Sequence, residues 1–192
     1  MVKKLFETIK VEDGQLLNIK WHNRRFNKSR LALFNIEEEI DLKEHINHIP
    51  QNGLYRCRVL YSKEIESVLF FAYPPKQFTS FKILKSSLSY NYKFDDRSEI
   101  NALKEKSFDE IIIEKEGLLT DTSIANIAFF DGKRWITPKK PLLNGTTRER
   151  LLHEGFLTLK NIKKEHIKNY SHFALMNAMI GFQIQKSVTI RE

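Results

Sequence analysis

The segment "EKEGLLTDTSIANIAFFDGKRWITPKKPLLNGTTRERLL", residues 114–152, carries much of the information about the fold. Apolar runs around the turn at Glu116-Gly117 predict two β-strands, and "WITP" predicts a short strand that ends at a proline. Asn144-Gly145-Thr146-Thr147 then predicts the start of a helix that continues to about His153. Strands and a helix in one run indicate a mixed α/β protein.

The rest of the chain continues this mixture. The alternating "KLFETIKV" followed by Glu12-Asp13-Gly14 predicts a hairpin. A helix with Ser98 as its N-cap is expected over residues 98–106. An earlier helix is indicated by apolar residues at helical spacing, namely Trp21, Phe26, Leu31 and Phe34. Further strands are expected at residues 54–62, 65–74, 80–88, 109–115, 123–131, 156–160, 172–176 and 185–190.

The order of these elements suggests two halves that each hold a sheet. The segment around residues 74–92, which is rich in Pro, Ser and Tyr, is the best candidate for a boundary between two subdomains. We therefore expect a small N-terminal α/β subdomain, residues 1–84, joined by residues 85–92 to a larger C-terminal subdomain, residues 93–192.

The composition is that of an ordinary globular protein, with 41% hydrophobic and 29% charged residues among 192. No apolar run reaches membrane length, and the first residues do not resemble a signal peptide. The single Cys57 excludes an internal disulfide and a multi-cysteine zinc site. The pair His45 and His48 lacks a third metal ligand at suitable spacing. We expect a cytoplasmic protein with no bound metal and no membrane association.

The net charge of +8 invites comparison with nucleic-acid-binding proteins. However, the basic residues are scattered, the densest runs (Lys139-Lys140 and Lys163-Lys164) are short, and no zinc-finger or RNP-type motif accompanies them. Attraction of a small acidic substrate or a phosphate-bearing cofactor fits the same charge. We therefore expect no nucleic-acid partner.

Three residues could carry chemistry. Lys93 lies between Tyr92 and Phe94, and a lysine that is partly desolvated by aromatic rings loses its proton more easily and can act as a nucleophilic amine. Asp121 could hold a cationic ring nitrogen. Asn126, inside a strand, needs a hydrogen-bond partner if it is buried. Each also has a structural explanation, namely a solvated lysine, a turn cap and a buried amide.

Two turns could bind an anion. Gly145-Thr146-Thr147 opens a helix, and the free N–H groups at a helix N-terminus attract phosphate. Glycine permits close approach of the backbone there, although an ordinary threonine N-cap would look the same. Asn177-Ala178, directly after a predicted strand, forms a second turn of the kind that can present N–H groups to an anion.

Taken in order, these motifs resemble the class IV aminotransferase family, the fold-type IV pyridoxal-phosphate enzymes. The resemblance covers nearly the whole chain. It starts at "LFET" (5–8), continues through "HNRRF" (22–26) and the Lys93 segment, and ends at "LMNAMIGF" (175–182). Its most specific part runs from Gly117 through Asn126 and Thr137-Pro138 to Arg148. It implies a two-subdomain fold like that of D-amino acid aminotransferases.

The resemblance also implies a role for each matched residue. Lys93 would be the catalytic residue, which forms the Schiff base with pyridoxal 5'-phosphate (PLP) and moves protons. Asp121 would be the acidic partner of the pyridine nitrogen, and Arg25 would bind the phosphate. The other residues implied to bind the cofactor are Asn126, Gly145, Thr146, Thr147, Asn177 and Ala178.

The sequence departs from the family pattern at three places. Many members have a glutamate where this chain has Asp121, so the carboxylate reaches less far by one methylene. The chain begins almost at "FET", without the N-terminal hairpin that most members carry, which implies a truncated N-terminus. Ser98 stands five residues after Lys93, where the branched-chain enzymes have a tyrosine.

Two local features resemble 4-amino-4-deoxychorismate lyases more than branched-chain enzymes. They are Lys93-x-x-x-Arg97 and Asn177-Ala178-Met179. The implied reaction eliminates pyruvate to give 4-aminobenzoate, a step of folate biosynthesis. One alternative is transamination of a branched-chain or D-amino acid, and another is a non-catalytic PLP-binding protein. The family resemblance further implies a homodimer that acts on a small acidic amine or amino acid.

Overall fold

The computed structural model describes residues 3–191 and divides the chain into two compact units. Unit 1 comprises the described residues up to Pro75 together with Tyr92–Asp96. Unit 2 comprises Lys76–Asn91 and the described residues from Arg97 onward. No helix within residues 3–191 is long and apolar enough to cross a membrane.

The boundaries of the two units differ from the subdomains expected at 1–84 and 93–192. Ser80–Lys85 forms a strand that pairs with a strand of unit 2, so it does not belong to the N-terminal half. Tyr92–Asp96 returns to unit 1, where Phe94 bridges Leu5. The boundary was misplaced because strand pairing between distant residues, and not local composition, decides which unit a segment joins.

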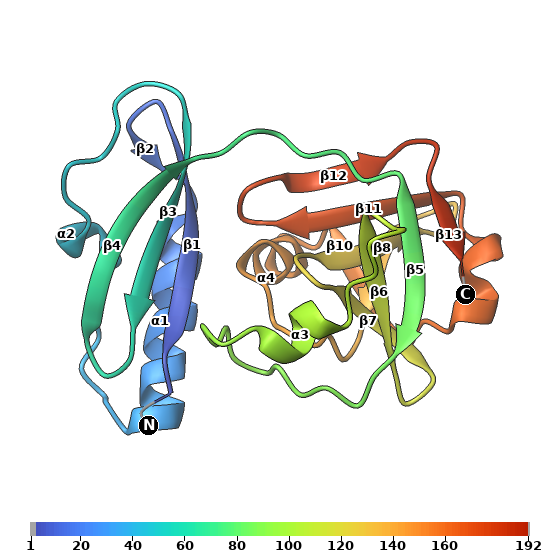
Figure 1. Ribbon diagram of the computed structural model, residues 1–192, viewed down its shortest axis with the longest axis horizontal. Coiled ribbons are helices and arrows are strands. Elements are labelled where there is room, and N and C mark those ends of the chain that lie inside the picture. Colours follow the sequence, from blue (N-terminus) through green and yellow to red (C-terminus); the bar gives the residue numbers. More distant parts are fainter. Residues whose placement is uncertain (1–2, 192) are drawn as a thin grey trace. The chain divides into compact units, whose positions relative to one another are not determined.

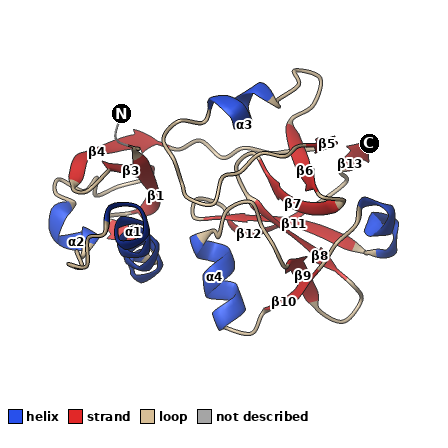
Figure 2. Ribbon diagram, turned by 90° about the horizontal axis from the view of Figure 1, so that it is seen from below, coloured by secondary structure: helices blue, strands red, loops and turns tan. Residues whose placement is uncertain are grey.

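Unit 1 is a four-stranded antiparallel sheet in the order β2-β1-β3-β4, with helix α1 packed on one face (Figures 1 and 2). The expected hairpin is present, with Asp13 and Gly14 at positive φ in the turn. The elements of this unit are β1 (Leu5–Glu12), β2 (Gln15–Leu16), α1 (Ile19–Phe34), α2 (Leu42–His45), β3 (Leu54–Tyr61) and β4 (Ile65–Ala72).

The expected helix over residues 21–34 is confirmed, but its buried face differs from the expected one. Its fully packed aromatic residue is Phe26, whose ring lies 4.4 Å from that of Tyr61 on β3. Leu31 is 49% exposed, because five residues along a helix turn the side chain about 140° away from Phe26. The buried positions instead recur every three or four residues, at His22, Phe26, Ser29 and Arg30.

Unit 2 is built on a nine-stranded sheet in the order β10-β9-β8-β7-β6-β5-β13, with β11 paired to β8 and β12 to β11 (Figure 1). Most of its strands are antiparallel, but β5 runs parallel to β6 and β13, and β9 to β10. The elements are β5 (Ser80–Lys85), α3 (Ser98–Ala102), β6 (Glu110–Lys115), β7 (Leu118–Thr122), β8 (Asn126–Phe130), β9 (Trp135–Pro138), α4 (Thr146–His153), β10 (Leu157–Lys160), the 3₁₀ helix η1 (Lys164–Asn169), β11 (His172–Asn177), β12 (Gly181–Gln185) and β13 (Thr189–Arg191).

Three local expectations in unit 2 were wrong. The residues directly after the Glu116-Gly117 turn form a separate strand, β7, and the strand expected at 123–131 is the next one, β8. Strand β12 was not expected. Helix α3 ends at Ala102, and Arg97 precedes it in the N-cap position, so Ser98 is its first residue and not its cap.

The core of unit 2 lies on both sides of the central strands. On one side, Ile127 and Phe129 of β8 pack with Phe173 and Leu175 of β11 and with residues of β5 and β6. On the other side, the small Ala128 faces helix α4. The alternation along β8 thus directs large side chains into one cluster and leaves room for α4 over the other face.

The structure predicts that Phe26 and Leu31 differ sharply in their contribution to stability. Phe26→Ala removes a fully buried ring and should lower the free energy of unfolding by about 3–5 kcal/mol. Leu31→Ala on the same helix should change it by less than about 0.5 kcal/mol. Urea unfolding followed by circular dichroism measures both. Equal losses in the two variants would contradict the assignment of the buried face.

Candidate functional site

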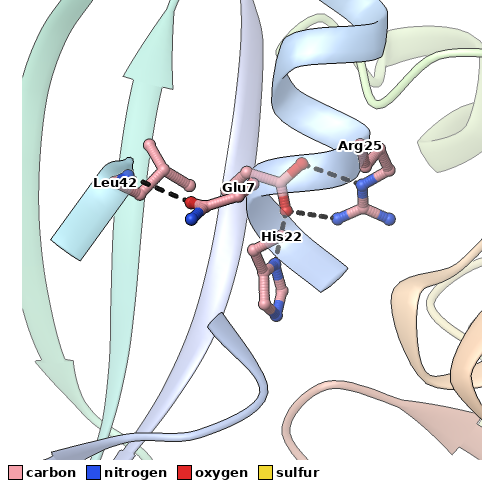
Figure 3. Close-up of polar contacts among 5 residues, drawn as sticks. Glu7, His22, Arg25 and Leu42 are labelled. Atoms are coloured by element: carbon pink, nitrogen blue, oxygen red, sulfur yellow. Dashed lines mark hydrogen bonds and ion pairs between the residues drawn. The ribbon is translucent and has the colours of Figure 1, made fainter. Parts of the chain in front are cut away.

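In unit 1 a buried carboxylate is hydrogen-bonded to two side chains of α1 (Figure 3). Glu7, on the face of β1 that α1 covers, is fully buried. Its Oε1 accepts from Arg25 Nε at 2.8 Å and its Oε2 accepts from Arg25 Nη2 at 2.5 Å. His22 Nδ1 lies 2.6 Å from Oε2. His22 and Arg25 can share one carboxylate because residues three apart in a helix lie on the same face.

The charges in this cluster follow from its burial. Burial alone would raise the pKa of Glu7, but the Arg25 charge and hydrogen bonds from His22 and Arg25 outweigh it and bring the pKa to about 2. Burial lowers the pKa of His22 despite the carboxylate beside it. Glu7 is therefore ionised and His22 neutral at neutral pH, so His22 Nδ1–H donates the bond. His22 Nε2 is buried and makes no hydrogen bond within the described residues.

Lys93 lies in the segment that returns to unit 1. It lies in an irregular stretch whose next residue, Phe94, bridges Leu5. The Lys93 carbonyl accepts from Phe6 N–H at 3.0 Å, and Nζ lies 4.5 Å from the centre of the Phe6 ring. The charge of Lys93 contributes to the lowered pKa of His22. Two adjacent residues of β1 therefore contact the two basic residues: Phe6 contacts Lys93, and Glu7 binds Arg25.

In unit 2 the adjacent strands β7 and β8 bring Asp121 and Asn126 together. Both are buried, and they are paired in register. Asn126 Nδ2 donates to Asp121 Oδ1 at 2.7 Å and to the Leu143 carbonyl at 2.8 Å. Leu143 N–H donates to Asp121 Oδ2 at 2.8 Å. The polar group expected to need a partner therefore has two, and it lies beside the loop that precedes α4.

Asp121 is a buried acid that is held mainly by neutral donors. Burial raises its pKa to about 6, although hydrogen bonds from Leu143 N–H and Asn126 and the charge of Arg148 act in the opposite direction. A carboxyl group with this pKa changes its charge near neutral pH. A cation placed against it would favour the ionised form.

Gly145 is the N-cap of α4, and Thr146 and Thr147 form the first turn, as expected. Its φ of −71° is open to any residue, so conformation does not require glycine there. The requirement is steric, because a Cβ on Gly145 would overlap Oδ1 of Asn126. Thr146 and Thr147 are both buried at the N-terminus of this eight-residue helix, where N–H groups and the helix dipole attract anions.

The turn at Asn177-Ala178 joins β11 to β12. Asn177 Oδ1 accepts from the N–H groups of Met179 and Ile180 at 2.9 and 3.0 Å, and its Nδ2 donates to the Ile124 carbonyl at 3.2 Å. The Asn177 side chain therefore shapes its own turn and ties it to the turn between β7 and β8.

The structure groups the expected residues within each unit. In unit 1, Arg25 on α1 and Lys93 in the returning segment contact neighbouring residues of β1, Glu7 and Phe6. In unit 2, hydrogen bonds and packing join Asp121, Asn126 and Gly145, which Thr146 and Thr147 follow in the chain, and Asn177 is bonded to the β7–β8 turn.

Three further residues had no role in the sequence analysis. Glu7 accepts two hydrogen bonds from Arg25, and His22 is bonded to the same carboxylate. Arg148 holds the loop before α4 in place by donating to the Pro138 carbonyl and Asn144 Oδ1. All three lie inside the motifs "LFET", "HNRRF" and Leu-x-Gly-x-x-Arg, which are the signal that could have identified them.

The first prediction for the site concerns the acid dependence of stability. Because the folded pKa of Glu7 lies below its ordinary value of 4.5, its stabilisation is present above pH 4.5 and is lost as the pH falls toward 2. Glu7→Gln should lower the free energy of unfolding at pH 7 by about 3 kcal/mol, from the size of the pKa shift. The gap to the parent protein should narrow between pH 4.5 and 2.

Urea unfolding at several pH values measures that gap. The control is Glu66→Gln, since Glu66 lies at the surface, where it pairs with Lys4, and its replacement should change stability little. A gap for Glu7→Gln that stays constant with pH would contradict the assignment.

The second prediction concerns the packing of Gly145 on Asn126. Gly145→Ala should destabilise the protein by about 1–3 kcal/mol, because the added methyl group pushes Asn126 away from Asp121 and Leu143. Gly145→Ala combined with Asn126→Ala should cost less than the sum of the single changes. Thermal unfolding of the four proteins gives this coupling. Additive losses would show that the two residues do not clash.

Comparison with known proteins identifies the family of this chain. The sequence model for "Amino-transferase class IV" matches residues 4–188. An uncharacterized protein of Haemophilus influenzae is 38% identical over 188 residues, covering 92% of this chain and 98% of the relative. The crystal structure of a "putative 4-amino-4-deoxychorismate lyase" from Haemophilus somnus 129pt has 36% identity and a TM-score of 0.85, covering 93% of this chain and 97% of that one.

A more distant structure shows the fold alone. It is the PLP-bound form of a hypothetical aminotransferase from Mycobacterium tuberculosis, with 16% identity and a TM-score of 0.76, covering 96% of this chain and 81% of that one. The mixed α/β fold expected from the sequence is thus confirmed. The chain belongs to the class IV aminotransferase family, a family of enzymes.

Proposed function

We propose that this protein is a PLP-dependent enzyme that eliminates pyruvate from 4-amino-4-deoxychorismate and releases 4-aminobenzoate. The observation that most supports PLP as the cofactor is the buried acid Asp121, which is hydrogen-bonded to the loop that leads into the N-terminus of α4. The choice of reaction is supported by the Haemophilus somnus structure, which is 36% identical over nearly the whole chain.

The residues present fit the chemical groups of PLP. An aldehyde needs an amine, a pyridine nitrogen needs an acid, and a phosphate needs a cation and N–H donors. Unit 1 supplies the Lys93 amine and the Arg25 guanidinium, which Glu7 holds in a fixed orientation. Unit 2 supplies Asp121 and the first turn of α4. By family resemblance, we propose that each of these residues has its stated role in binding PLP.

When bound, the pyridine ring of PLP acts as an electron sink for negative charge that develops on the substrate next to its amino nitrogen. Asp121 would keep a proton on the ring nitrogen, which is the form that withdraws electrons best. Lys93 would hold the cofactor and, as a free amine, would take the proton from the substrate carbon that bears the amino group. Loss of that proton and of the enolpyruvyl group together make the substrate ring aromatic.

Arg25 and the N–H groups at the start of α4 would bind the phosphate and so help to hold the cofactor. Because Glu7 is ionised and bidentate, the Arg25 guanidinium is held in one plane before any ligand arrives. The excess of basic residues suits a substrate with two carboxylates. By family resemblance we also propose a homodimer, which light scattering would detect.

The cofactor proposal predicts a covalent link at one lysine. Purified protein mixed with PLP should gain visible absorbance, and borohydride reduction should attach the cofactor to the peptide that contains Lys93. Lys93→Ala should lose the attachment, whereas Lys10→Ala, which removes a surface ion pair on β1, should keep it. A parent protein that takes up no PLP would refute the proposed function.

The reaction itself is tested with 4-amino-4-deoxychorismate as substrate. The PLP-loaded protein should release pyruvate and 4-aminobenzoate in equal amounts, and Lys93→Ala should release neither. Exchange between amino acids and keto acids without 4-aminobenzoate would assign the protein to transamination instead. Bound PLP with neither activity would point to a non-catalytic PLP-binding protein.

A further inference from the structure

The peptide groups that flank Leu143 are held from two sides by buried side chains. Leu143 N–H donates to Asp121 Oδ2 at 2.8 Å, and the Leu143 carbonyl accepts from Asn126 Nδ2 at 2.8 Å. The same nitrogen of Asn126 donates to Asp121 Oδ1 at 2.7 Å. These three bonds close a ring that lies two residues before Gly145.

Asn126 has no N–H left for a ligand. A side-chain amide carries two N–H donors, and Asn126 uses one on Asp121 and the other on Leu143. Its Oδ1 packs against Gly145 so closely that a Cβ there would overlap it. Asn126 therefore contacts both the acid and the first residue of the phosphate-binding turn, without a free donor of its own.

Helix α4 fixes the same loop from its other side. Arg148 Nη2 donates to the Pro138 carbonyl at 2.7 Å, and Nη1 donates to Asn144 Oδ1 at 3.2 Å. The loop from Pro138 to Gly145 is thus bonded near both ends. Its last residues move only if the bonds of Asp121, Asn126 or Arg148 rearrange.

We propose that Asn126 is a positioning residue that couples Asp121 to the phosphate-binding turn Gly145–Thr147, and that it does not bind the cofactor itself. The inference rests on the proposed function, since it concerns PLP. Its consequence is specific. If Asp121 acted on the pyridine ring alone, replacing it would leave the binding of the phosphate unchanged. However, Asp121 accepts a hydrogen bond from Leu143, in the loop that leads into the turn Gly145–Thr147. Replacing Asp121 should therefore also weaken the binding of the phosphate.

The test compares PLP with pyridoxal, which lacks the phosphate. The variants are Asn126→Ala and Asp121→Asn, and the control is Thr120→Val. Thr120 is a buried neighbour of Asp121 on β7 that donates to the Ile113 carbonyl and is not part of the ring. In both variants the ratio of PLP affinity to pyridoxal affinity should fall about tenfold, because buried hydrogen bonds that hold the turn are lost. The control should keep the ratio of the parent protein.

A second measurement needs no cofactor and covers the case in which one variant folds poorly. Leu143 N–H donates a hydrogen bond to Asp121. Glu149 N–H donates the first backbone hydrogen bond of α4, to the Gly145 carbonyl at 2.9 Å. Hydrogen exchange of these two amides should be faster in the apoprotein of Asn126→Ala or Asp121→Asn and unchanged in Thr120→Val.

The outcomes separate the inference from the function. A parent protein that binds PLP, with an unchanged affinity ratio in both variants, overturns the coupling alone. A parent protein that binds no PLP overturns the proposed function, and unchanged exchange at Leu143 and Glu149 then overturns the positioning role as well. A shift of the bound phosphate resonance in ³¹P spectra of Asn126→Ala, with none in Thr120→Val, would support the coupling directly.

Discussion

The burial of Asp121 is the constraint on which the site of unit 2 depends. A carboxylate loses much of its hydration when it is buried, and only hydrogen bonds and opposite charges offset that loss. Here the partners are Leu143 N–H, the Asn126 amide and the charge of Arg148. Because Leu143 and Arg148 belong to the loop and helix that bear Gly145, the groups that stabilise the acid also fix the N-terminus of α4.

Two of the buried acids, Glu7 and Asp121, show how hydrogen-bond partners decide whether a buried carboxyl group is ionised. Glu7 receives two hydrogen bonds from a guanidinium, so its pKa falls to about 2 in spite of burial. Asp121 receives its hydrogen bonds from neutral N–H groups, so burial prevails and its pKa rises to about 6. Glu7 is thus a permanent anion that orients Arg25. The charge of Asp121 instead responds to what binds near it, which suits the role proposed for it beside a ring nitrogen.

Local patterns predicted the features whose signals are local. The first hairpin and the start of α4 were correct because Asp13-Gly14 and Gly145-Thr146 mark them. Features set by distant contacts were not predictable in this way. The unit boundary depended on parallel pairing of β5 with β6, and no short window of sequence contains that information. Within the site, Glu7 was not assigned because a glutamate in an alternating strand usually faces solvent, and its partners lie 15 and 18 residues away on α1.

Gly145 was expected to permit close approach of a phosphate, but the structure shows that it also makes room for Asn126. The absence of a side chain at Gly145 therefore serves both the expected approach of a phosphate and the packing of Asn126. Any residue that replaced the glycine would first displace the amide that bonds Asp121. The acid, the amide and the glycine are consequently constrained as one set.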